Sequence, residues 1–229
     1  MQLIQQQMHR DDDFKGQRYD ILGIQHPGGL PWHAASMVSP QLPADLEPAL
    51  ARYLGLLDRW NRTHALTALP PGDRWEELLL DAAALLPHLA GLPAGARVAD
   101  LGTGMGSPAV VLALARPDLE VLGVDASAKK LAFVRQVALE LPIPNLRPVH
   151  GRLEQMEPLL ADLGVAKALG PLDQLAGWWA RHGRPGAPFL ALKGPEWERE
   201  PRPEGWSVEA HSYDLPTRGR RVLVALRRA

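Results

Sequence analysis

The fold of this 229-residue chain is decided by one stretch of its sequence, Val98-Ala-Asp100-Leu-Gly102-Thr-Gly104-Met-Gly106-Ser-Pro108. The apolar run over 97–101 predicts a strand, and the segment 108–116 predicts a helix that tolerates proline in its first turn. Glycines in such a turn let the backbone approach a ligand without a Cβ in the way. The helix start adds free N–H donors. The pattern therefore predicts a ligand-binding loop.

An acidic residue stands at the matching place after the next strand. The run 120–124 predicts that strand, and Asp125 ends it, nineteen residues after Gly106. The carboxyl ends of neighbouring parallel strands meet at one edge of a sheet, where ligands of such folds bind. We expect Asp125 to lie beside the glycines and to accept hydrogen bonds from two ribose hydroxyls.

Two classes of cofactor compete for this loop. A dinucleotide site has the spacing G-x-G-x-x-G, whereas here the spacing is G-x-G-x-G and Ser107 occupies the third-glycine position. The Asp100 carboxylate would repel a pyrophosphate but would attract the amino group of a methionine moiety. These features favour S-adenosylmethionine over NAD. A glycine-rich turn without a ligand is the alternative.

The rest of the chain continues the alternation of strands and helices. This order implies a parallel sheet with right-handed crossovers. The strand around Gly164 is the weakest, because the sequence there lacks a continuous β-forming run. The remaining predicted elements are strands over 145–150, 163–168 and 188–193, helices over 128–141 and 172–182, and a terminal antiparallel hairpin over 206–213 and 221–227.

The chain before residue 93 divides into a tail and a helical cap. Residues 1–44 are expected to be mostly irregular, with a short strand over 19–24 as an option. Residues 45–92 carry apolar side chains at helical spacing, and a second helix is expected to open at Asp73 with Glu76 as its capping-box partner. Residues 93–229 would then form the α/β domain.

Composition narrows the function classes. The 25 lysines and arginines balance 26 acidic residues, so a protein that is basic all over is excluded. The absence of cysteine excludes disulfides, cysteine metal sites and thiol catalysis. No apolar run reaches the ~18–20 residues of a membrane span. We therefore expect a cytoplasmic protein without a membrane segment.

Several motifs, taken as an ordered set, resemble those of the ribosomal small subunit methyltransferase G family, also called glucose-inhibited division protein B. The matching segments are Trp60-Asn61 with 65–69, then 79–82, 100–108, 124–133, Asn145 with 151–154, and 191–194. The resemblance covers roughly residues 46–229. It implies a Rossmann-like seven-stranded S-adenosylmethionine-dependent methyltransferase fold with a small helical N-terminal cap. The implied activity is methylation of guanine N7 in 16S ribosomal RNA, by a monomer acting on the RNA or the small ribosomal subunit.

The resemblance also implies positions for the cofactor. The loop glycines Gly102, Gly104 and Gly106, followed by Ser107, would line the methionine side, and Asp125 would hold the ribose. Leu153 and Glu154 would lie near the adenine, and Lys167 would sit at the mouth of the pocket. The cofactor-binding set is therefore Gly102, Gly104, Gly106, Ser107, Asp125, Leu153, Glu154 and Lys167.

Two of these positions depart from the family pattern. Ser107 replaces a bulky apolar residue, and Lys167 replaces an arginine, whose bidentate contacts a lysine lacks. Two alternatives therefore stay open. One is a diverged methyltransferase acting on another RNA or a small molecule, and the other is a cofactor-binding or RNA-binding paralogue without turnover.

Methyl transfer to guanine N7 needs no catalytic base, because N7 already carries a free lone pair. The chemistry needs positioning and dehydration. The scattered histidines agree with this, and His150 is interpreted as structural. No catalytic residue and no metal ligand is therefore assigned.

Charge is unevenly distributed along the chain. Residues 181–229 hold 10 basic and 6 acidic residues, against 15 and 20 in residues 1–180. Basic residues suit contacts with RNA phosphates, and Trp197 and Trp206 are candidates for stacking on a base, whereas Trp178 and Trp179 are interpreted as core and rim. The basic candidates are Arg181, Arg184, Lys193, Arg218, Arg220 and Arg221, with Lys129 and Lys130 beside the second strand.

Overall fold

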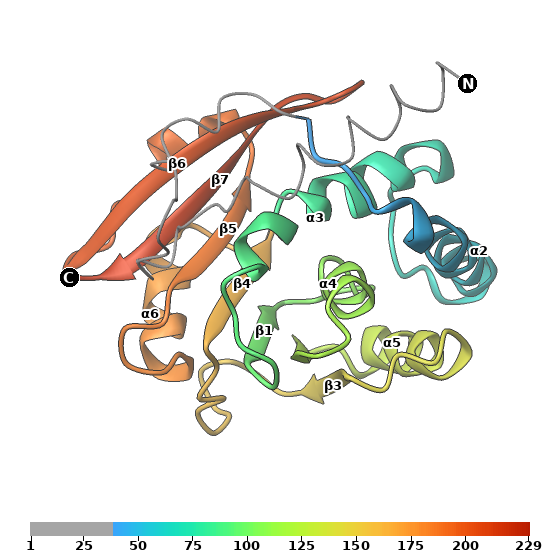
Figure 1. The fold of residues 1–229 in the computed structure, drawn as a ribbon, viewed down its shortest axis with the longest axis horizontal. Helices are drawn as coiled ribbons and strands as arrows, with labels where there is room; N and C mark the ends of the chain where they lie inside the picture. Colours follow the sequence, from blue (N-terminus) through green and yellow to red (C-terminus); the bar gives the residue numbers. More distant parts are fainter. Residues whose placement is uncertain (1–38) are drawn as a thin grey trace, which may run out of the picture.

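The computed structural model describes residues 39–229, and the short strand considered over 19–24 lies outside them. Seven strands form one sheet in the order β3-β2-β1-β4-β5-β7-β6 (Figure 1). β1 to β5 run parallel, and β7 is antiparallel to both β5 and β6. The expected fold class and terminal hairpin are confirmed. The strands are β1 (Arg97–Leu101), β2 (Glu120–Asp125), β3 (Leu146–His150), β4 (Leu163–Lys167), β5 (Phe189–Lys193), β6 (Trp206–Leu215) and β7 (Gly219–Arg228).

The strand that looked weakest in the sequence is a regular central strand. β4 pairs with β1 on one side and with β5 on the other. Gly164 is required there for space, because a Cβ would lie 2.3 Å from the Phe189 ring and 2.7 Å from the Trp179 ring. The glycine that weakens the strand signal therefore admits two large rings to the core.

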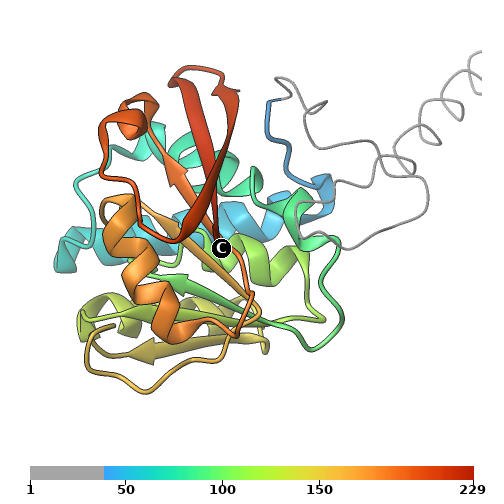
Figure 2. The same cartoon turned by 90° about the vertical axis from the view of Figure 1, so that its left-hand side faces the viewer.

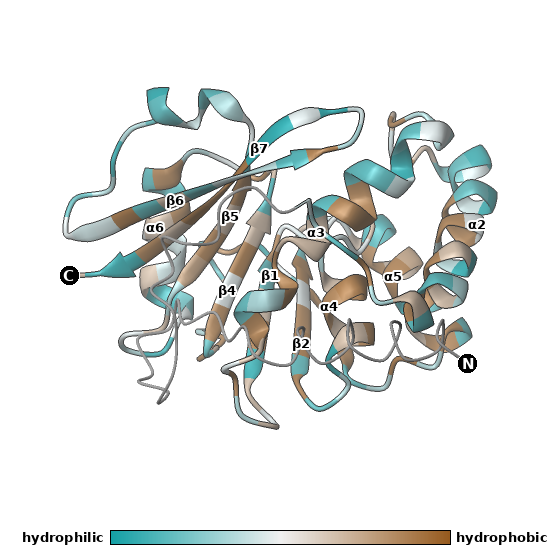
Figure 3. Ribbon diagram, turned by 45° about the horizontal axis from the view of Figure 1, so that its top comes forward, coloured by the Kyte–Doolittle hydropathy of each residue, from teal (hydrophilic) through white to brown (hydrophobic). Residues whose placement is uncertain are grey.

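Helices cover both faces of the sheet. α4 (Ala109–Ala115) and α5 (Ala128–Glu140) lie on one face with the cap, and α6 (Leu172–His182) lies on the other, toward the viewer in Figure 2. Trp179 of α6 is buried with Ala99 and Ala166 of the sheet. In Figure 3 the central strands are apolar, while the outer side of α2 (Glu47–His64) is hydrophilic. No helix within residues 39–229 has the length and apolarity needed to cross a membrane.

The cap packs into the same core as α4 and α5. Leu50, Tyr53 and Leu57 of α2 belong to one buried cluster with Val110 of α4 and Val134 of α5. The rest of the cap consists of short helical segments. One precedes α2, namely η3 (Ala44–Leu46). Those that follow α2 are η4 (Pro71–Asp73), the π-helical η5 (Trp75–Leu80), α3 (Asp81–Ala83) and η6 (Leu86–Leu89).

The capping box expected at Asp73 and Glu76 is wrong. Asp73 ends a short turn, and no side chain within the described residues caps the helix that follows. The Glu76 carboxylate instead accepts hydrogen bonds from the Thr217 amide, the Thr217 hydroxyl and the Arg218 amide at 2.8, 2.7 and 3.0 Å. Burial alone would raise the pKa of Glu76, but these hydrogen bonds lower it. A contact with the distant β6–β7 turn has therefore replaced the local cap.

Candidate functional site

The glycine loop leaves the carboxyl end of β1 in conformations that favour glycine. The φ angles of Gly102, Gly104 and Gly106 are 73°, 57° and 101°. At Gly102 there is a steric demand as well, since a Cβ would lie 2.4 Å from Leu169 Cδ1. The loop then enters α4 at Ala109.

Asp125 lies against this loop, as the sequence predicted. Its Oδ2 accepts a 2.9 Å hydrogen bond from the Gly104 amide, and its Oδ1 accepts one of 2.7 Å from the Ser127 amide. The Thr103 amide also donates to the Val124 carbonyl at 2.8 Å. The end of β2 therefore holds the glycine loop in place.

Asp100 is completely buried beneath the loop. Its Oδ2 accepts a 3.2 Å hydrogen bond from the Ala109 amide, whereas its Oδ1 has no hydrogen-bond partner among the described residues. Burial raises the pKa of Asp100 to about 7, although the Thr103 hydroxyl, the Ala109 amide and the Lys167 ammonium favour the charged form. The Thr103 hydroxyl is also buried without a hydrogen-bond partner among the described residues, and it favours the charged form of Asp100, so it is one donor available to Oδ1. A ligand ammonium group would supply another.

Lys167 stands on the same face of the sheet as Asp100. It ends β4 two residues after Val165, the register partner of Asp100 on β1, and alternate residues of a strand share a face. Its Nζ lies 3.1 Å from Asp81 Oδ2. The Lys167 side chain is 15 % exposed and the Asp81 side chain 4 %, so this ion pair is largely buried.

Asp81 and Tyr213 belong to this region, and sequence reasoning assigned neither a role. The Tyr213 hydroxyl donates a 2.5 Å hydrogen bond to Asp81 Oδ1. Burial raises the pKa of Tyr213, and the Asp81 charge raises it further. The sequence feature that could have pointed to this contact is Asp81 itself, because it is the one acidic residue inside the apolar run 78–86.

Ser107 faces the cap. Its hydroxyl donates a 2.6 Å hydrogen bond to the Leu78 carbonyl in η5, and the Tyr53 hydroxyl of α2 donates to the Met105 carbonyl at 3.0 Å. Burial raises the pKa of Tyr53. A serine at this position therefore has a structural use that a bulky apolar residue lacks, because it ties the glycine loop to the cap.

Leu153 and Glu154 lie toward α6. The Leu153 side chain is buried in the cluster that contains Trp179, and its carbonyl lies 2.8 Å from His182 Nε2. The Glu154 Oε1 accepts a 2.9 Å hydrogen bond from Trp178 Nε1. The structure thus brings the glycines, Asp100, Asp125 and Lys167 to the carboxyl edge of the parallel strands. Leu153 and Glu154 follow β3, which lies beyond β2 in the sheet.

Most basic candidates for RNA contact already have protein partners. Lys193 Nζ lies 2.8 Å from Glu200 Oε2, and Arg221 pairs with Glu77 at 2.8 Å. The other paired residues are Arg184 with Asp162, Arg218 with Asp73 and Glu77, Arg220 with Asp214, and Arg181 with the Met156 carbonyl.

The tryptophans also have partners within the protein. The Arg202 guanidinium lies 4.4 Å from the centre of the Trp197 ring. Trp206 packs, partly buried, against the core cluster below α6, and Trp179 is 1 % exposed.

The fold is similar to that of solved structures. TrmN from Thermus thermophilus superposes with a TM-score of 0.51 at 22 % identity, covering 72 % of this chain and 55 % of that one. A SAM-dependent methyltransferase from Aquifex aeolicus gives 0.52 at 17 % identity, covering 74 % and 97 %. At these identities the likeness establishes the fold alone.

Sequence comparison is more specific. The chain is 40 % identical over 172 residues to ribosomal RNA small subunit methyltransferase G of Bordetella avium, covering 72 % of this chain and 77 % of the relative. Identity to the protein of that name from Xanthomonas oryzae pv. oryzae is 41 % over 189 residues, covering 79 % and 86 %. The family description "rRNA small subunit methyltransferase G" matches residues 46–214. The chain therefore belongs to the rRNA small subunit methyltransferase G family.

Proposed function

We propose that this protein transfers the methyl group of S-adenosylmethionine to N7 of a guanine in 16S ribosomal RNA. Family membership supports the reaction and the cofactor. The observation that supports the cofactor's position is the buried Asp100 carboxylate, whose Oδ1 has only the nearby Thr103 hydroxyl as a donor in the described part of the chain. It stands directly below three glycines with positive φ angles, at the carboxyl edge of β1. A carboxylate there suits the amino group of a methionine moiety.

The rest of the cofactor site is proposed from the same edge of the sheet. The backbone of Gly102, Gly104, Gly106 and Ser107 would border the methionine side. Asp125 would accept from the ribose hydroxyls with the lone pairs that the Gly104 and Ser127 amides leave free. Leu153 and Glu154 would border the adenine, and Lys167 would stand at the mouth of the pocket, held by Asp81.

The reaction requires little acid–base catalysis by the protein. When bound, S-adenosylmethionine supplies an electrophilic methyl group on a sulfonium sulfur. Guanine N7 has its lone pair available, so no side chain needs to remove a proton before attack. The residues at this edge are proposed to bind and orient the reactants and to exclude water. Most of the rate acceleration would arise from this positioning.

We further propose that the protein acts as a monomer in the cytoplasm.

One experiment tests the reaction. N7-methylguanine is mapped in 16S rRNA after incubation of unmethylated small subunits, or of protein-free 16S rRNA, with the purified protein and S-adenosylmethionine. We expect one new N7-methylguanine, absent with Asp100→Asn. Calorimetry with S-adenosylhomocysteine accompanies the map. Binding without any new methylated guanine in either RNA would refute the proposed reaction and favour the paralogue without turnover.

A further inference from the structure

We infer that the RNA backbone docks on a cationic corner where the end of α2 meets the start of α5. This corner is defined by Arg62, Lys129 and Lys130, and it is called the α2–α5 corner below. The inference rests on the proposed function, because it names the surface on which the RNA substrate of that reaction binds. It also ranks this corner above the basic residues of segment 181–229 as the main contact for RNA phosphates.

The two helices run antiparallel, and hydrogen bonds at both ends show this. Arg52 near the start of α2 donates to the Glu140 carbonyl at the end of α5, at 2.9 Å. At the opposite end, Lys129 Nζ donates to the His64 carbonyl at 2.7 Å. Arg62 is exposed in the last turn of α2, so it stands at the same end as Lys129 and Lys130.

Positive charge at this corner has no acidic partner within residues 39–229. The sequence holds no acidic residue over 59–72 or over 126–139. Among residues 39–229, the side chains of Arg62 and Lys130 form no ion pair or hydrogen bond, and Lys129 bonds only a neutral carbonyl.

The carboxylates that flank these segments are in use. Asp58 pairs with Arg74, and Glu140 pairs with Arg59 and also accepts from Gln136. Asp125 accepts from two backbone amides. The corner therefore presents cations without acidic partners, whereas the hairpin arginines Arg218 and Arg221 are already neutralised by Asp73 and Glu77.

Helix stability does not explain the two lysines. The first turn of a helix favours acidic side chains, because the helix dipole places partial positive charge there. α5 has no acid in its first turn and carries Lys129 and Lys130 instead. Their charge adds to that of the helix end, which weakens the helix slightly and raises the local positive potential. Such a local conflict is expected where a surface serves binding.

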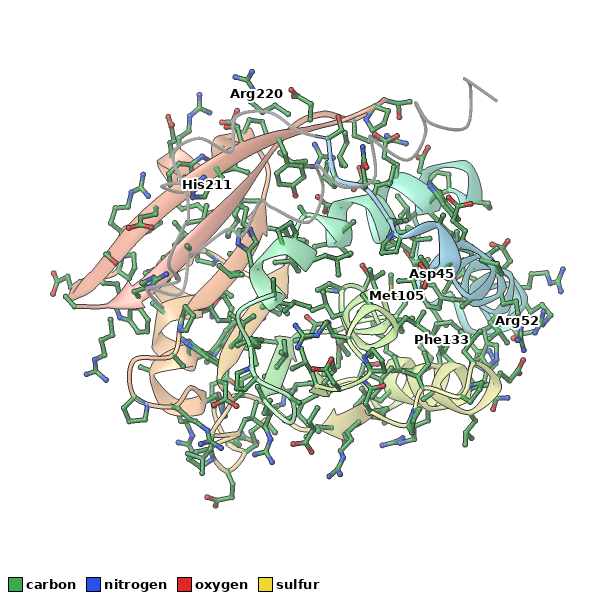
Figure 4. All side chains as sticks on the ribbon, in the orientation of Figure 1. Asp45, Arg52, Met105, Phe133, His211 and Arg220 are labelled. Carbon is green, nitrogen blue, oxygen red and sulfur yellow. The ribbon has the colours of Figure 1, made fainter. Side chains whose placement is uncertain are left out.

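The corner also lies next to the proposed methyl-transfer site. Ser127 precedes α5 and donates its amide to Asp125, the proposed ribose ligand, at 2.7 Å. Lys129 is thus four residues from the cofactor edge. In Figure 4, Arg52 on α2 and Arg220 on the hairpin lie on well-separated sides of the molecule, so α2 and the hairpin do not share one basic surface. Phosphates held at the α2–α5 corner would bring a guanine to the glycine loop.

The test compares two triple variants with the same change of charge. The corner variant carries R62Q, K129Q and K130Q, and the control variant carries R199Q, R220Q and R228Q, which removes exposed arginines from the hairpin and from the turn before it. Binding of each full-length protein to transcribed 16S rRNA is measured over a range of KCl concentrations. Loss of three phosphate contacts should lower the slope of log K against log[salt] by about 2 and weaken binding at least roughly tenfold. The control should bind like the unaltered protein.

Two measurements distinguish a failure of this inference from a failure of the proposed methyl transfer. S-adenosylhomocysteine affinity and the melting temperature of the corner variant should stay unchanged, which shows that the cofactor site and the fold are intact. RNA binding and its salt slope are measured without turnover, so absent methylation would refute the proposed reaction and leave this result standing. An unchanged slope and affinity in the corner variant would overturn the inference, and a loss confined to the control variant would return the RNA to the hairpin.

Discussion

The Tyr213 hydroxyl donates a 2.5 Å hydrogen bond to Asp81 Oδ1 and thereby joins β6 to the cap across 132 positions of the chain. The other oxygen of Asp81 lies 3.1 Å from Lys167 Nζ, at the carboxyl end of β4. One buried carboxylate therefore connects the cap, the hairpin and the strand beside Asp100. Lys167 fits this arrangement because a single ammonium needs only one such oxygen.

The first prediction concerns this link. Tyr213→Phe should lower the free energy of unfolding by about 1–3 kcal/mol, because a charged acceptor is left buried with one donor fewer. Tyr53→Phe is the matched control, since it removes a hydrogen bond to the neutral Met105 carbonyl and should cost about 0.5–1.5 kcal/mol. Urea unfolding monitored by circular dichroism measures both. An equal or larger loss in Tyr53→Phe would show that the Asp81 charge adds nothing.

The second prediction follows from the raised pKa of Asp100. Its pKa rises from 3.8 to about 7 on folding. Between pH 3.8 and about pH 7 the ligand-free folded protein therefore holds a proton on Asp100 that the unfolded chain has lost. Its stability falls as the pH rises through that window. A ligand ammonium prefers the ionised carboxylate. Affinity for S-adenosylhomocysteine should therefore increase by about tenfold between pH 6 and pH 8, as the ionised fraction grows.

Asp100→Asn is the control for this pH effect. The variant should bind the ligand weakly and with little dependence on pH, while its melting temperature at pH 8 should equal or exceed that of the unaltered protein. Calorimetry and thermal unfolding over the same pH range make the comparison. A pH profile that persists in Asp100→Asn would assign the titration to another group.

Much of this architecture was predictable because its signals are local. The glycine loop, the acid after β2 and the terminal hairpin follow from spacing within short segments, and the structure places Gly104 and Asp125 in direct hydrogen-bond contact. The cofactor roles of these residues, and the division into a tail, a cap and a methyltransferase domain, stay predictions.

What escaped sequence reasoning depends on distant contacts. Glu76 has the spacing of a capping box, but it binds the turn at Thr217. Lys193 ends a strand at the ligand edge, yet Glu200 neutralises it. The role of Asp81 in α3 depends on Tyr213 of β6 and Lys167 of β4, which are distant in the sequence. Periodicity and spacing carry no information about such pairs.

The third prediction concerns Asp125. Asp125→Ala removes the acceptor of the Gly104 amide and the proposed ribose ligand, so cofactor affinity should fall by about 1–3 kcal/mol. Calorimetry with S-adenosylhomocysteine measures the change. Because alanine also leaves the Gly104 amide without its acceptor, Asp125→Asn serves as the second variant. It retains an acceptor for that amide, so its cofactor affinity should lie between those of the unaltered protein and Asp125→Ala. Unchanged affinity in Asp125→Ala would contradict the ribose assignment.

The last prediction separates backbone strain from steric demand in the glycine loop. Gly102 and Gly104 both have positive φ, so alanine at either position should cost about 1–2 kcal/mol of stability from the left-handed conformation. Only at Gly102 would the new Cβ also collide with a side chain, at Leu169 Cδ1, whereas at Gly104 it would make only an ordinary contact of 3.9 Å with the Gly102 carbonyl oxygen. Gly102→Ala should therefore be the more destabilising variant. Adding Leu169→Ala should recover part of the loss in Gly102→Ala but none in Gly104→Ala, because only the first carries the collision. Urea unfolding of the two single and two double variants tests this, and equal recovery in both backgrounds would show that Leu169 does not restrict the loop.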